Sequence, residues 1–438
     1  MLVVLEMGHT GVAAIRLPRL AALAGMAALA ALLVVISQAL AFSHDEIEHV
    51  HAAWHVSAGR LPYRDFFQNH HPLFYYLLAP ALGSRPWPTD LLAIRAGVLL
   101  VAFGIAAATF RLALEATASR RIAWTAVVLL LTCSTFVRAG IEIRPDVPFA
   151  LAATVAYVFF ARAVRTRGAG WLGASGAALA AGLLLHQKAI VVVGALAVAG
   201  AWEWRGRGVL RAAWLVVPSL GALVLVAAWF DARSALRDYW AMAWVFPSAA
   251  ARASSHHGYG QLEANLLQNA WLWVAALAGG VFAFARSRTQ TGSLRPLALT
   301  AALLLASVAA GLRVFDQYFL PAWPLVAVLA ASALVWWAER GRRPGRRLVV
   351  AAGVVAAVPV AVLFSWTRPA HGEQIERMAF VAAITPAGGA VYDGDNRLNL
   401  FREDVHHFWY AAGREPETSV YNRVAGPGRT PYDGCAAI

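Results

Sequence analysis

Long uncharged apolar runs alternate with short arginine-rich segments along most of this chain. The first apolar run covers residues 20–42. Ten more follow at residues 91–114, 122–138, 147–164, 171–186, 188–204, 210–230, 266–286, 297–313, 318–337 and 347–366. A helix needs about 20 mostly apolar residues to cross a bilayer, and many of these runs approach that length. The pattern therefore predicts an all-α polytopic membrane protein with about 11 transmembrane helices.

The composition supports the same class. Of the 438 residues, 60% are hydrophobic and 14% are charged, and the mean hydropathy is +0.58. Soluble domains carry about 25% charged residues, so this chain cannot be a soluble enzyme or a disordered interaction protein. Two cysteines, Cys133 and Cys435, cannot build a disulfide framework or a zinc ribbon.

The arginines indicate the orientation. If the N-terminus is cytoplasmic, the cytoplasmic segments collect Arg16, Arg19, Arg111, Arg120, Arg121, Arg162, Arg165, Arg167, Arg205, Arg207, Arg211, Arg286, Arg288, Arg295, Arg340, Arg342, Arg343, Arg346 and Arg347. This bias follows the positive-inside rule and accounts for the net charge of +13, so no nucleic-acid partner is expected. We expect an uncleaved signal anchor, a bacterial inner-membrane location and an extracytoplasmic C-terminus.

The same topology predicts the domains. Residues 1–366 form the transmembrane domain, with outer loops at residues 43–90 and 231–265, and residues 367–438 form a small extracytoplasmic C-terminal region.

The densest polar cluster follows the first apolar run. Asp45 and Glu46 lie where the helix leaves the bilayer, and six histidines share the same loop. A half-desolvated carboxylate has a raised pKa and can take a proton from an acceptor hydroxyl. Capping or solvation of a helix end explains the two acids equally well.

The histidines raise the question of a metal. On a helix, Asp45 and His49 fall four residues apart, as do His51 and His55, so facing ligands are geometrically available. No HExxH motif is present, and we assign no metal ligand, although a divalent metal remains open. A phosphate-binding Walker or Gly-x-Gly-x-x-Gly motif is also absent from the sequence, which disfavours a nucleotide sugar as donor.

The loop continues with motifs that together are more specific. The Asp-Glu pair is followed by Gly59-x-x-Pro-Tyr63-x-Asp65 and then by His71-Pro-Leu-Phe-Tyr75, preceded by His70. This order resembles the first exoplasmic loop of the C-type (GT-C) membrane glycosyltransferases. They include the protein O-mannosyltransferases, the lipid A aminoarabinose transferases and the rhizobial galacturonosyltransferase group. The resemblance implies juxtamembrane helices near residues 47–57 and 72–83, lying on the bilayer.

Three later motifs agree in order with this resemblance. Arg144-Pro-Asp146-Val-Pro resembles the second acidic motif of the family, although an ion pair at a helix start would look the same. His186-Gln-Lys188-Ala contains the one lysine of the sequence, which could bind a phosphate or snorkel to the interface. Phe315-Asp-Gln317-Tyr318-Phe-Leu-Pro resembles a polar–Tyr–x–Leu–Pro motif. Alternatively, Asp316 in that motif pairs with Arg313.

The resemblance implies a function. The donor would be a polyprenyl-phosphate-linked monosaccharide, and transfer would invert the anomeric centre. Asp45 would be the general base, with Glu46 and Asp146 shaping or polarising the site. Arg144, Lys188 and Tyr318 would bind the phosphate by charge-assisted hydrogen bonds. The remaining substrate-binding candidates are His70, His71, Tyr63 and Gln317. The acceptor, a lipid, glycan or protein, is left open.

Two other functions compete with this one. A transporter or flippase of lipid-linked sugars would place polar residues and broken helices inside the membrane, whereas these spans are nearly free of internal charge. A non-catalytic relative of the fold is the third alternative.

Overall fold

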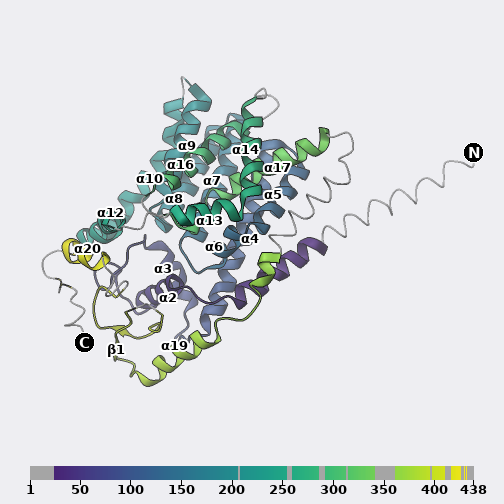
Figure 1. Cartoon of the computed structure of the whole chain (residues 1–438). Coiled ribbons are helices and arrows are strands. Elements are labelled where there is room, and N and C mark those ends of the chain that lie inside the picture. Colours follow the sequence, from purple (N-terminus) through teal and green to yellow (C-terminus); the bar gives the residue numbers. More distant parts are fainter. Residues whose placement is uncertain are drawn as a thin grey trace, which may run out of the picture.

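The structure is a computed structural model that describes residues 24–205, 208–253, 259–285, 292–311, 314–340, 361–394, 397–409 and 416–425, together with residues 429 and 431. Almost all regular structure in these ranges is helical, as the apolar runs predict. The described part of the chain folds as a bundle of long helices with smaller elements gathered at one end (Figure 1).

The centre of the bundle is formed by α4 (Asp90–Thr117), α7 (Asp146–Thr166), α8 (Ala169–Leu185) and α10 (Gly208–Asp231). In this set α7 packs on both α4 and α8, and α8 packs on α10. The remaining long helices flank them: α17 (Trp323–Arg340) packs on α14 (Ala270–Ala285) and α5 (Arg120–Thr132), and α16 (Leu294–Ala309) packs on α9 (Ala189–Trp204).

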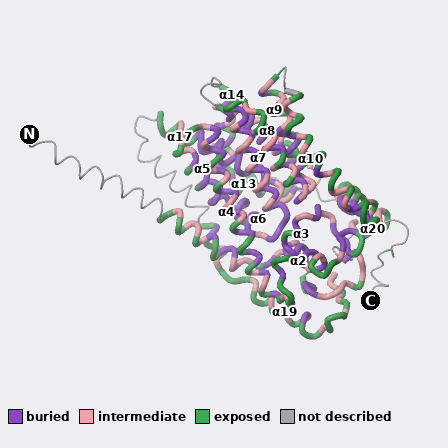
Figure 2. Tube along the Cα trace, turned by 180° about the vertical axis from the view of Figure 1, so that it is seen from behind, coloured by how far each residue is buried: buried purple, intermediate pink, exposed green. Residues whose placement is uncertain are grey.

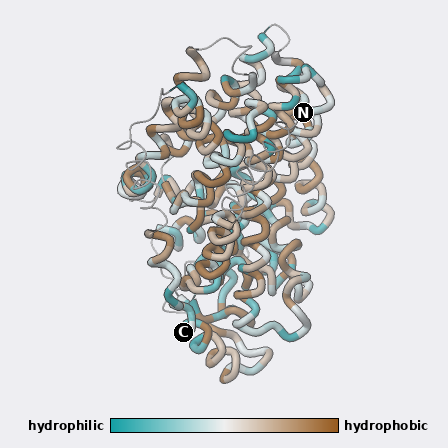
Figure 3. The backbone as a smooth tube through the Cα atoms, turned by 90° about the vertical axis from the view of Figure 1, so that its right-hand side faces the viewer, coloured by the Kyte–Doolittle hydropathy of each residue, from teal (hydrophilic) through white to brown (hydrophobic). Residues whose placement is uncertain are grey.

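The helices differ in how much apolar surface they bury. In the most apolar stretch of α7, 61% of the residues are buried, whereas in that of α10 only 22% are. Leu210 and Leu225 on α10 are 75% and 72% exposed. Figure 2 shows the buried residues inside the bundle and exposed ones around it, and Figure 3 shows that many bundle helices are strongly hydrophobic. Apolar side chains that point outward are what a bilayer accommodates, so α10 has the surface of a lipid-facing helix.

Fewer of the described helices are long and apolar enough to cross a membrane than the sequence predicts. Among the described residues, α4, α7 and Leu210–Asp231 of α10 are long and apolar enough to cross a membrane, and three bent helix pairs raise the count to six. The helices α8, α9 and α16 are apolar but shorter. Residues 20–23 of the first predicted span and 347–360 of the last lie outside the described residues. The predicted count of 11 therefore stays a prediction.

Three pairs of successive helices meet at sharp bends, and two of these bends fall inside the predicted spans 122–138 and 266–286. Helix Ala24–Ala39 meets α2 (His44–Ser57) at 77°, α5 meets α6 (Ser134–Ile141) at 69°, and the Leu262–Gln268 part of α13 (Tyr259–Gln268) meets α14 at 84°. Hydropathy alone predicts none of these bends, because it reports apolarity and carries no information on axis direction. The first bend gives α2 its own direction, as expected for a juxtamembrane helix.

Short elements complete the same end of the molecule. The first outer loop contributes α3 (Leu73–Leu78) and η1 (Ala79–Ala81). The second contributes α11 (Leu236–Trp240), the π-helical η3 (Ala241–Val245) and α12 (Phe246–Ala253), and η4 (Asp316–Phe319) precedes α17. The C-terminal region adds α19 (Gly372–Ile384), β1 (Ala390–Val391), β2 (Glu403–Asp404) and α20 (Glu417–Val424). The two strands pair in parallel, with Ala390 opposite Glu403.

The C-terminal region contacts the first bend directly. The Gln374 side chain on α19 accepts a hydrogen bond from the backbone N–H of Phe42 at 2.8 Å and donates one to its carbonyl at 2.9 Å. The backbone N–H of Ala370 donates to the Ala39 carbonyl at 2.8 Å. These bonds satisfy backbone groups that the bend removes from regular helix.

Close helix packing depends on two glycines. A Cβ atom at Gly279 on α14 would overlap the Leu329 carbonyl on α17, and one at Gly176 on α8 would overlap the Trp214 carbonyl on α10. By contrast, a Cβ at Gly280 would meet nothing within 4 Å. Glycine at these two contacts lets the backbones approach, as is common in membrane helix pairs.

We therefore expect Gly279→Ala to destabilise the bundle and Gly280→Ala to be nearly neutral. Overpacking a close contact costs about 1–3 kcal/mol because one helix must shift. The unfolding midpoint of the two purified variants in detergent measures the difference. Equal midpoints would contradict the α14–α17 packing described above.

Candidate active site

The start of α2 is fixed by local sequence. Ser43 is the N-cap: its hydroxyl accepts the Glu46 N–H at 3.3 Å, and the Glu46 carboxylate accepts the Ser43 N–H at 2.9 Å. This reciprocal pair is a capping box, which satisfies two backbone donors that a helix start would otherwise leave unpaired. It sets Asp45 and Glu46 in the first turn, where acidic side chains favour the helix dipole.

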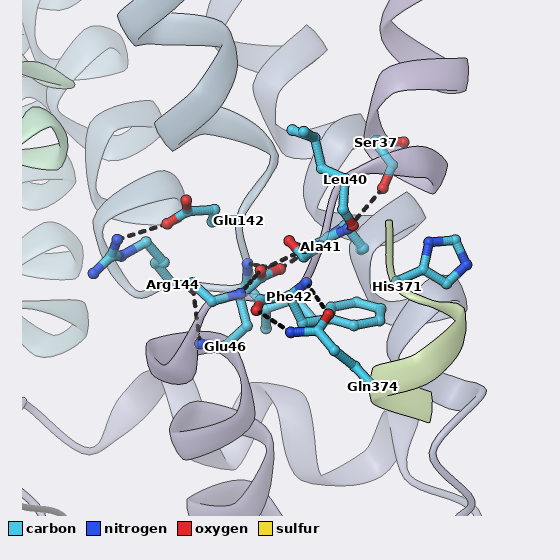
Figure 4. Close-up of polar contacts among 12 residues, drawn as sticks. Ser37, Leu40, Ala41, Phe42, Glu46, Glu142, Arg144, His371 and Gln374 are labelled. Atoms are coloured by element: carbon cyan, nitrogen blue, oxygen red, sulfur yellow. Dashed lines mark hydrogen bonds and ion pairs between the residues drawn. The ribbon is translucent and has the colours of Figure 1, made fainter. Parts of the chain in front are cut away.

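Glu46 is completely buried in an ion pair with Arg95 of α4. Arg95 donates from Nε to Oε1 at 2.9 Å and from Nη2 to Oε2 at 2.6 Å, and Oε1 also accepts the backbone N–H of Ile143 at 3.1 Å. The rest of the guanidinium donates to the carbonyls of Ser37, Leu40 and Ala41 (Figure 4). Glu46 therefore joins three segments of the chain.

Asp45 lies beside this pair but keeps some exposure. Its side chain is 19% exposed, forms an ion pair with Arg144, and lies 2.9 Å from Nε2 of His44. Because Asp45 and Glu46 are consecutive on a helix, they face different neighbours. The structure thus separates the two acids by environment, one enclosed and the other reachable from solvent.

Arg144 connects Asp45 to the second acidic motif. Its Nη1 donates to Glu142 at 2.6 Å, and its Nε lies 3.9 Å from Asp146. Figure 4 shows Arg144 beside Glu142 and near Glu46. Burial, together with the nearby Glu46 carboxylate, raises the pKa of Glu142.

Asp146 brings the lysine into the same cluster. Its Oδ1 lies 3.5 Å from Nζ of Lys188 and 3.5 Å from Nε2 of His186. The Lys188 ammonium also lies 3.6 Å from the ring centroid of Tyr318, close enough for a cation–π interaction. One third of the Lys188 side chain remains exposed, so its ammonium has both fixed partners and access to solvent.

His70 completes this side of the cluster. Its ring packs between those of His49 and His186, with centroids 5.3 Å and 5.0 Å away. Burial lowers the pKa of His70 well below the ordinary value, and it does the same for His186, where the Lys188 charge adds to the effect. Both imidazoles are therefore neutral at physiological pH. Within the described residues, Nδ1 of His70 is buried and has no hydrogen-bond partner.

Other predicted binding residues shape the loop. The Tyr63 hydroxyl donates to the His70 carbonyl at 2.6 Å, and Tyr63 is fully buried. His71 points away from His70: its Nδ1 donates to the Leu183 carbonyl at 2.5 Å, and its Nε2 contacts the Tyr239 hydroxyl at 3.2 Å. These contacts fix the loop on α8 and α11.

Gln317 precedes Tyr318 in η4. Tyr318 reaches Lys188, whereas no hydrogen bond or ion pair of the Gln317 side chain is found among the described residues. Asp316 lies 3.5 Å from the Asn265 amide nitrogen. Arg313, the alternative partner suggested for Asp316, lies outside the described residues.

Three further residues, Arg95, Glu142 and His186, belong to these contacts without having been candidates from their sequence motifs. Arg95 is an isolated charge inside an apolar run, which usually marks a partner at membrane depth and could have identified it. Glu142 lies two residues before Arg144 and contacts it. His186 lies two residues before Lys188, and both contact Asp146. Only the fold shows these contacts.

Comparison with known proteins agrees with the sequence resemblance. Residues 70–230 match the family model of dolichyl-phosphate-mannose-protein mannosyltransferases. No curated protein matches the chain in sequence. Among solved structures, the fold is similar to that of ArnT from Cupriavidus metallidurans bound to undecaprenyl phosphate, with a TM-score of 0.57 and 14% identity. That match covers 83% of this chain and 71% of ArnT.

Two structures from Archaeoglobus fulgidus are also similar. The oligosaccharyltransferase tethered with an acceptor peptide has a TM-score of 0.54 and 11% identity, over 82% of this chain and 57% of that one. The oligosaccharyltransferase AglB in complex with an inhibitory peptide and a dolichol-phosphate has a TM-score of 0.52 and 11% identity, over 82% and 58%. The predicted resemblance to the C-type membrane glycosyltransferases is confirmed.

The Glu46–Arg95 pair generates a stability prediction. Arg95→Met leaves Glu46 as an unpaired buried carboxylate, so we expect the free energy of unfolding to fall by about 3–5 kcal/mol. The double variant Arg95→Met/Glu46→Leu removes both charges and should recover part of this loss. Thermal unfolding of the two purified variants compares them. A double variant less stable than Arg95→Met would contradict the enclosed ion pair.

Proposed function

We propose that the protein is a membrane glycosyltransferase that moves a sugar from a polyprenyl-phosphate-linked donor to an extracytoplasmic lipid, glycan or protein acceptor, with inversion. The observation that carries this proposal is the continuous cluster from Asp45 through Arg144 and Asp146 to Lys188. It places a solvent-reachable carboxylate next to cations that suit a phosphate. Undecaprenyl phosphate in ArnT and dolichol-phosphate in AglB support this class of donor.

In the proposed reaction Asp45 is the general base. The acceptor oxygen attacks the anomeric carbon as Asp45 takes the hydroxyl proton. The bond between that carbon and the phosphate oxygen breaks, and polyprenyl phosphate leaves with the electron pair. One displacement from the opposite face inverts the anomeric centre. The exposure of Asp45 allows an acceptor to reach it, whereas Glu46 is completely enclosed.

Arg144 and Lys188 are proposed to stabilise the departing phosphate. Both are fixed before substrate arrives, Arg144 by its carboxylate partners and Lys188 by Asp146 and the Tyr318 ring. Preorganised cations at a low-dielectric boundary stabilise developing negative charge without reorganising in the transition state. The neutral His70 adds a polar ring beside them, while Tyr63 and His71 position its loop. Gln317 is left as a binding candidate on the same η4 turn.

The arginine distribution supports a cytoplasmic N-terminus, which puts this cluster and the C-terminal region on the extracytoplasmic side. A bacterial inner membrane then supplies a polyprenyl-phosphate donor in the outer leaflet. A flippase of lipid-linked sugars is the competing function, and it would move the donor without breaking the sugar–phosphate bond.

The first test is transfer itself. Membranes containing the full chain are incubated with a panel of radiolabelled polyprenyl-phosphate sugars and a crude extract of host lipids, glycans and envelope proteins. We expect label on an acceptor with the wild type and a loss of at least about 100-fold with Asp45→Asn, because a general base contributes about that factor or more. Asp90→Asn is the matched control, since Asp90 begins α4 outside the cluster and accepts the Trp87 N–H.

Undiminished transfer by Asp45→Asn would leave an enzyme and remove Asp45 as its base. Movement of intact labelled donor across the bilayer without transfer would favour the flippase. Both variants must show the wild-type unfolding midpoint for these comparisons to count.

The second test concerns the leaving phosphate. Charge-assisted hydrogen bonds contribute about 1.5–3 kcal/mol, so Lys188→Gln should weaken polyprenyl-phosphate binding by about 10- to 150-fold, and Lys188→Arg should retain most of it. Competition of polyprenyl phosphate against labelled donor in detergent micelles measures both variants. An unchanged affinity in Lys188→Gln would place the phosphate elsewhere.

A further inference from the structure

A second polar cluster lies further along α2, away from the candidate active site. His51 and His55 occupy one face of α2, and Asp404 comes from β2. Oδ2 of Asp404 lies 2.9 Å from Nε2 of His51 and 3.0 Å from Nε2 of His55, and the two Nε2 atoms are 3.1 Å apart. Three atoms that are good metal ligands thus converge on one point.

The cluster is shielded from water. The side chains of His51, His55 and Asp404 are 0%, 1% and 10% exposed. The rings of Trp54 and Trp409 pack against His51, and that of Phe66 stacks on His55. In such apolar surroundings an unpaired polar group is costly, so each donor among these three side chains needs an acceptor and each charge needs an opposite charge nearby.

The hydrogen bonds around the cluster leave one contact unbalanced. Nδ1 of His51 lies 3.0 Å from the Leu400 carbonyl, which can only accept, so the proton of a neutral His51 ring is on Nδ1. Its Nε2 then presents a lone pair to the Asp404 carboxylate. With a neutral His51, this lone pair and the Asp404 oxygen face each other at 2.9 Å, a repulsive contact that either a proton on Nε2 of His51 or a metal ion between the two atoms removes.

We propose that His51, His55 and Asp404 bind a divalent transition-metal ion of the zinc class, which fastens α2 to the C-terminal region. Ligand atoms on tetrahedral zinc are about 3.3 Å apart, since each bond is about 2.0–2.1 Å, so the observed triangle needs to widen only slightly. The outer contacts fit as well. His51 donates to a carbonyl, and Oδ1 of Asp404 accepts from the Asn399 amide at 2.9 Å, which are the bonds that orient metal ligands.

Arg60 controls this site. Its Nη1 donates to Nδ1 of His55 at 3.0 Å, and its Nη2 pairs with Glu403. Ligation through Nε2 puts the proton of His55 on Nδ1, facing the same arginine, so the ion displaces Arg60 from His55 and leaves it with Glu403. About one third of the Arg60 side chain is exposed, so it has room to move. Arg60 and the ion therefore compete for His55.

The ion has a structural task in this proposal. His51 is six residues after Asp45, or about 9 Å along the helix axis, so the metal does not reach the reacting atoms. It would instead anchor the helix whose first turn carries Asp45 and Glu46. This inference does not depend on the proposed transfer reaction.

The test uses the full chain purified in detergent without a metal-binding tag and stripped with a chelator. Zinc chloride is the probe, with bound zinc measured after equilibrium dialysis and the unfolding midpoint measured with and without zinc. We expect one zinc ion per chain and a higher midpoint in the wild type. His51→Gln/His55→Gln should bind at least about 100-fold more weakly and lose the shift. His371→Gln, a histidine on the N-terminal side of α19 and outside the cluster, is the matched control.

Arg60→Gln provides a second, opposite readout. It removes a competing charge and offers a carbonyl oxygen to the Nδ1–H of His55, so zinc should bind more tightly than in the wild type. X-ray absorption of the zinc-loaded wild type should show two imidazole nitrogens and a carboxylate oxygen as ligands. This measurement uses only the wild-type protein, so it does not depend on the folding of a variant. Absence of stoichiometric zinc in the wild type, or equal binding by the double variant, would overturn the proposal and assign the positive charge to a proton on His51.

Discussion

The buried pair of Glu46 and Arg95 is the contact on which the arrangement of the candidate active site depends. Through it the Ala24–Ala39 helix, α2 and α4 share one set of hydrogen bonds, and the backbone of Ile143 is attached to the same carboxylate. Asp45 precedes Glu46 and Arg144 follows Ile143, so fixing the inner residues of both segments brings their outer neighbours together. The ion pair of Asp45 and Arg144 is a consequence of this geometry.

Burial divides the acidic residues near this pair into two kinds. Glu46 is enclosed and saturated with donors, which is the condition under which a buried charge is tolerated. Asp45 and Lys188 keep part of their side chains exposed while remaining paired. Exposed, oriented charges at a low-dielectric boundary are the ones that a substrate can reach and that act on it with little screening. The enclosed carboxylate and the partly exposed one thus belong to adjacent residues.

The sequence could predict much of this cluster because its members stand in short motifs. Asp45, Arg144, Asp146, Lys188 and Tyr318 were each found from a local pattern, and the structure brings them into one chain of contacts. Helix positions were also predictable, since apolarity over 16 or more residues is a local property. The bends inside the spans 122–138 and 266–286 and the partner of Glu46 were not, because they depend on contacts between residues far apart in sequence. The packing roles of Tyr63 and His71 likewise required the fold, since a motif does not report which way a side chain points.

The bonds from Gln374 to both backbone groups of Phe42 join residues 332 positions apart. The bend that starts α2 therefore has its backbone partners supplied by a segment that the ribosome makes 332 residues later. Membrane helices made earlier can insert and pack in order, but the turn that leads into Asp45 closes only after α19 has been made and has docked. The candidate site is therefore completed after the bundle helices that precede α19, and a nascent chain that lacks α19 would leave the backbone groups of Phe42 without these partners.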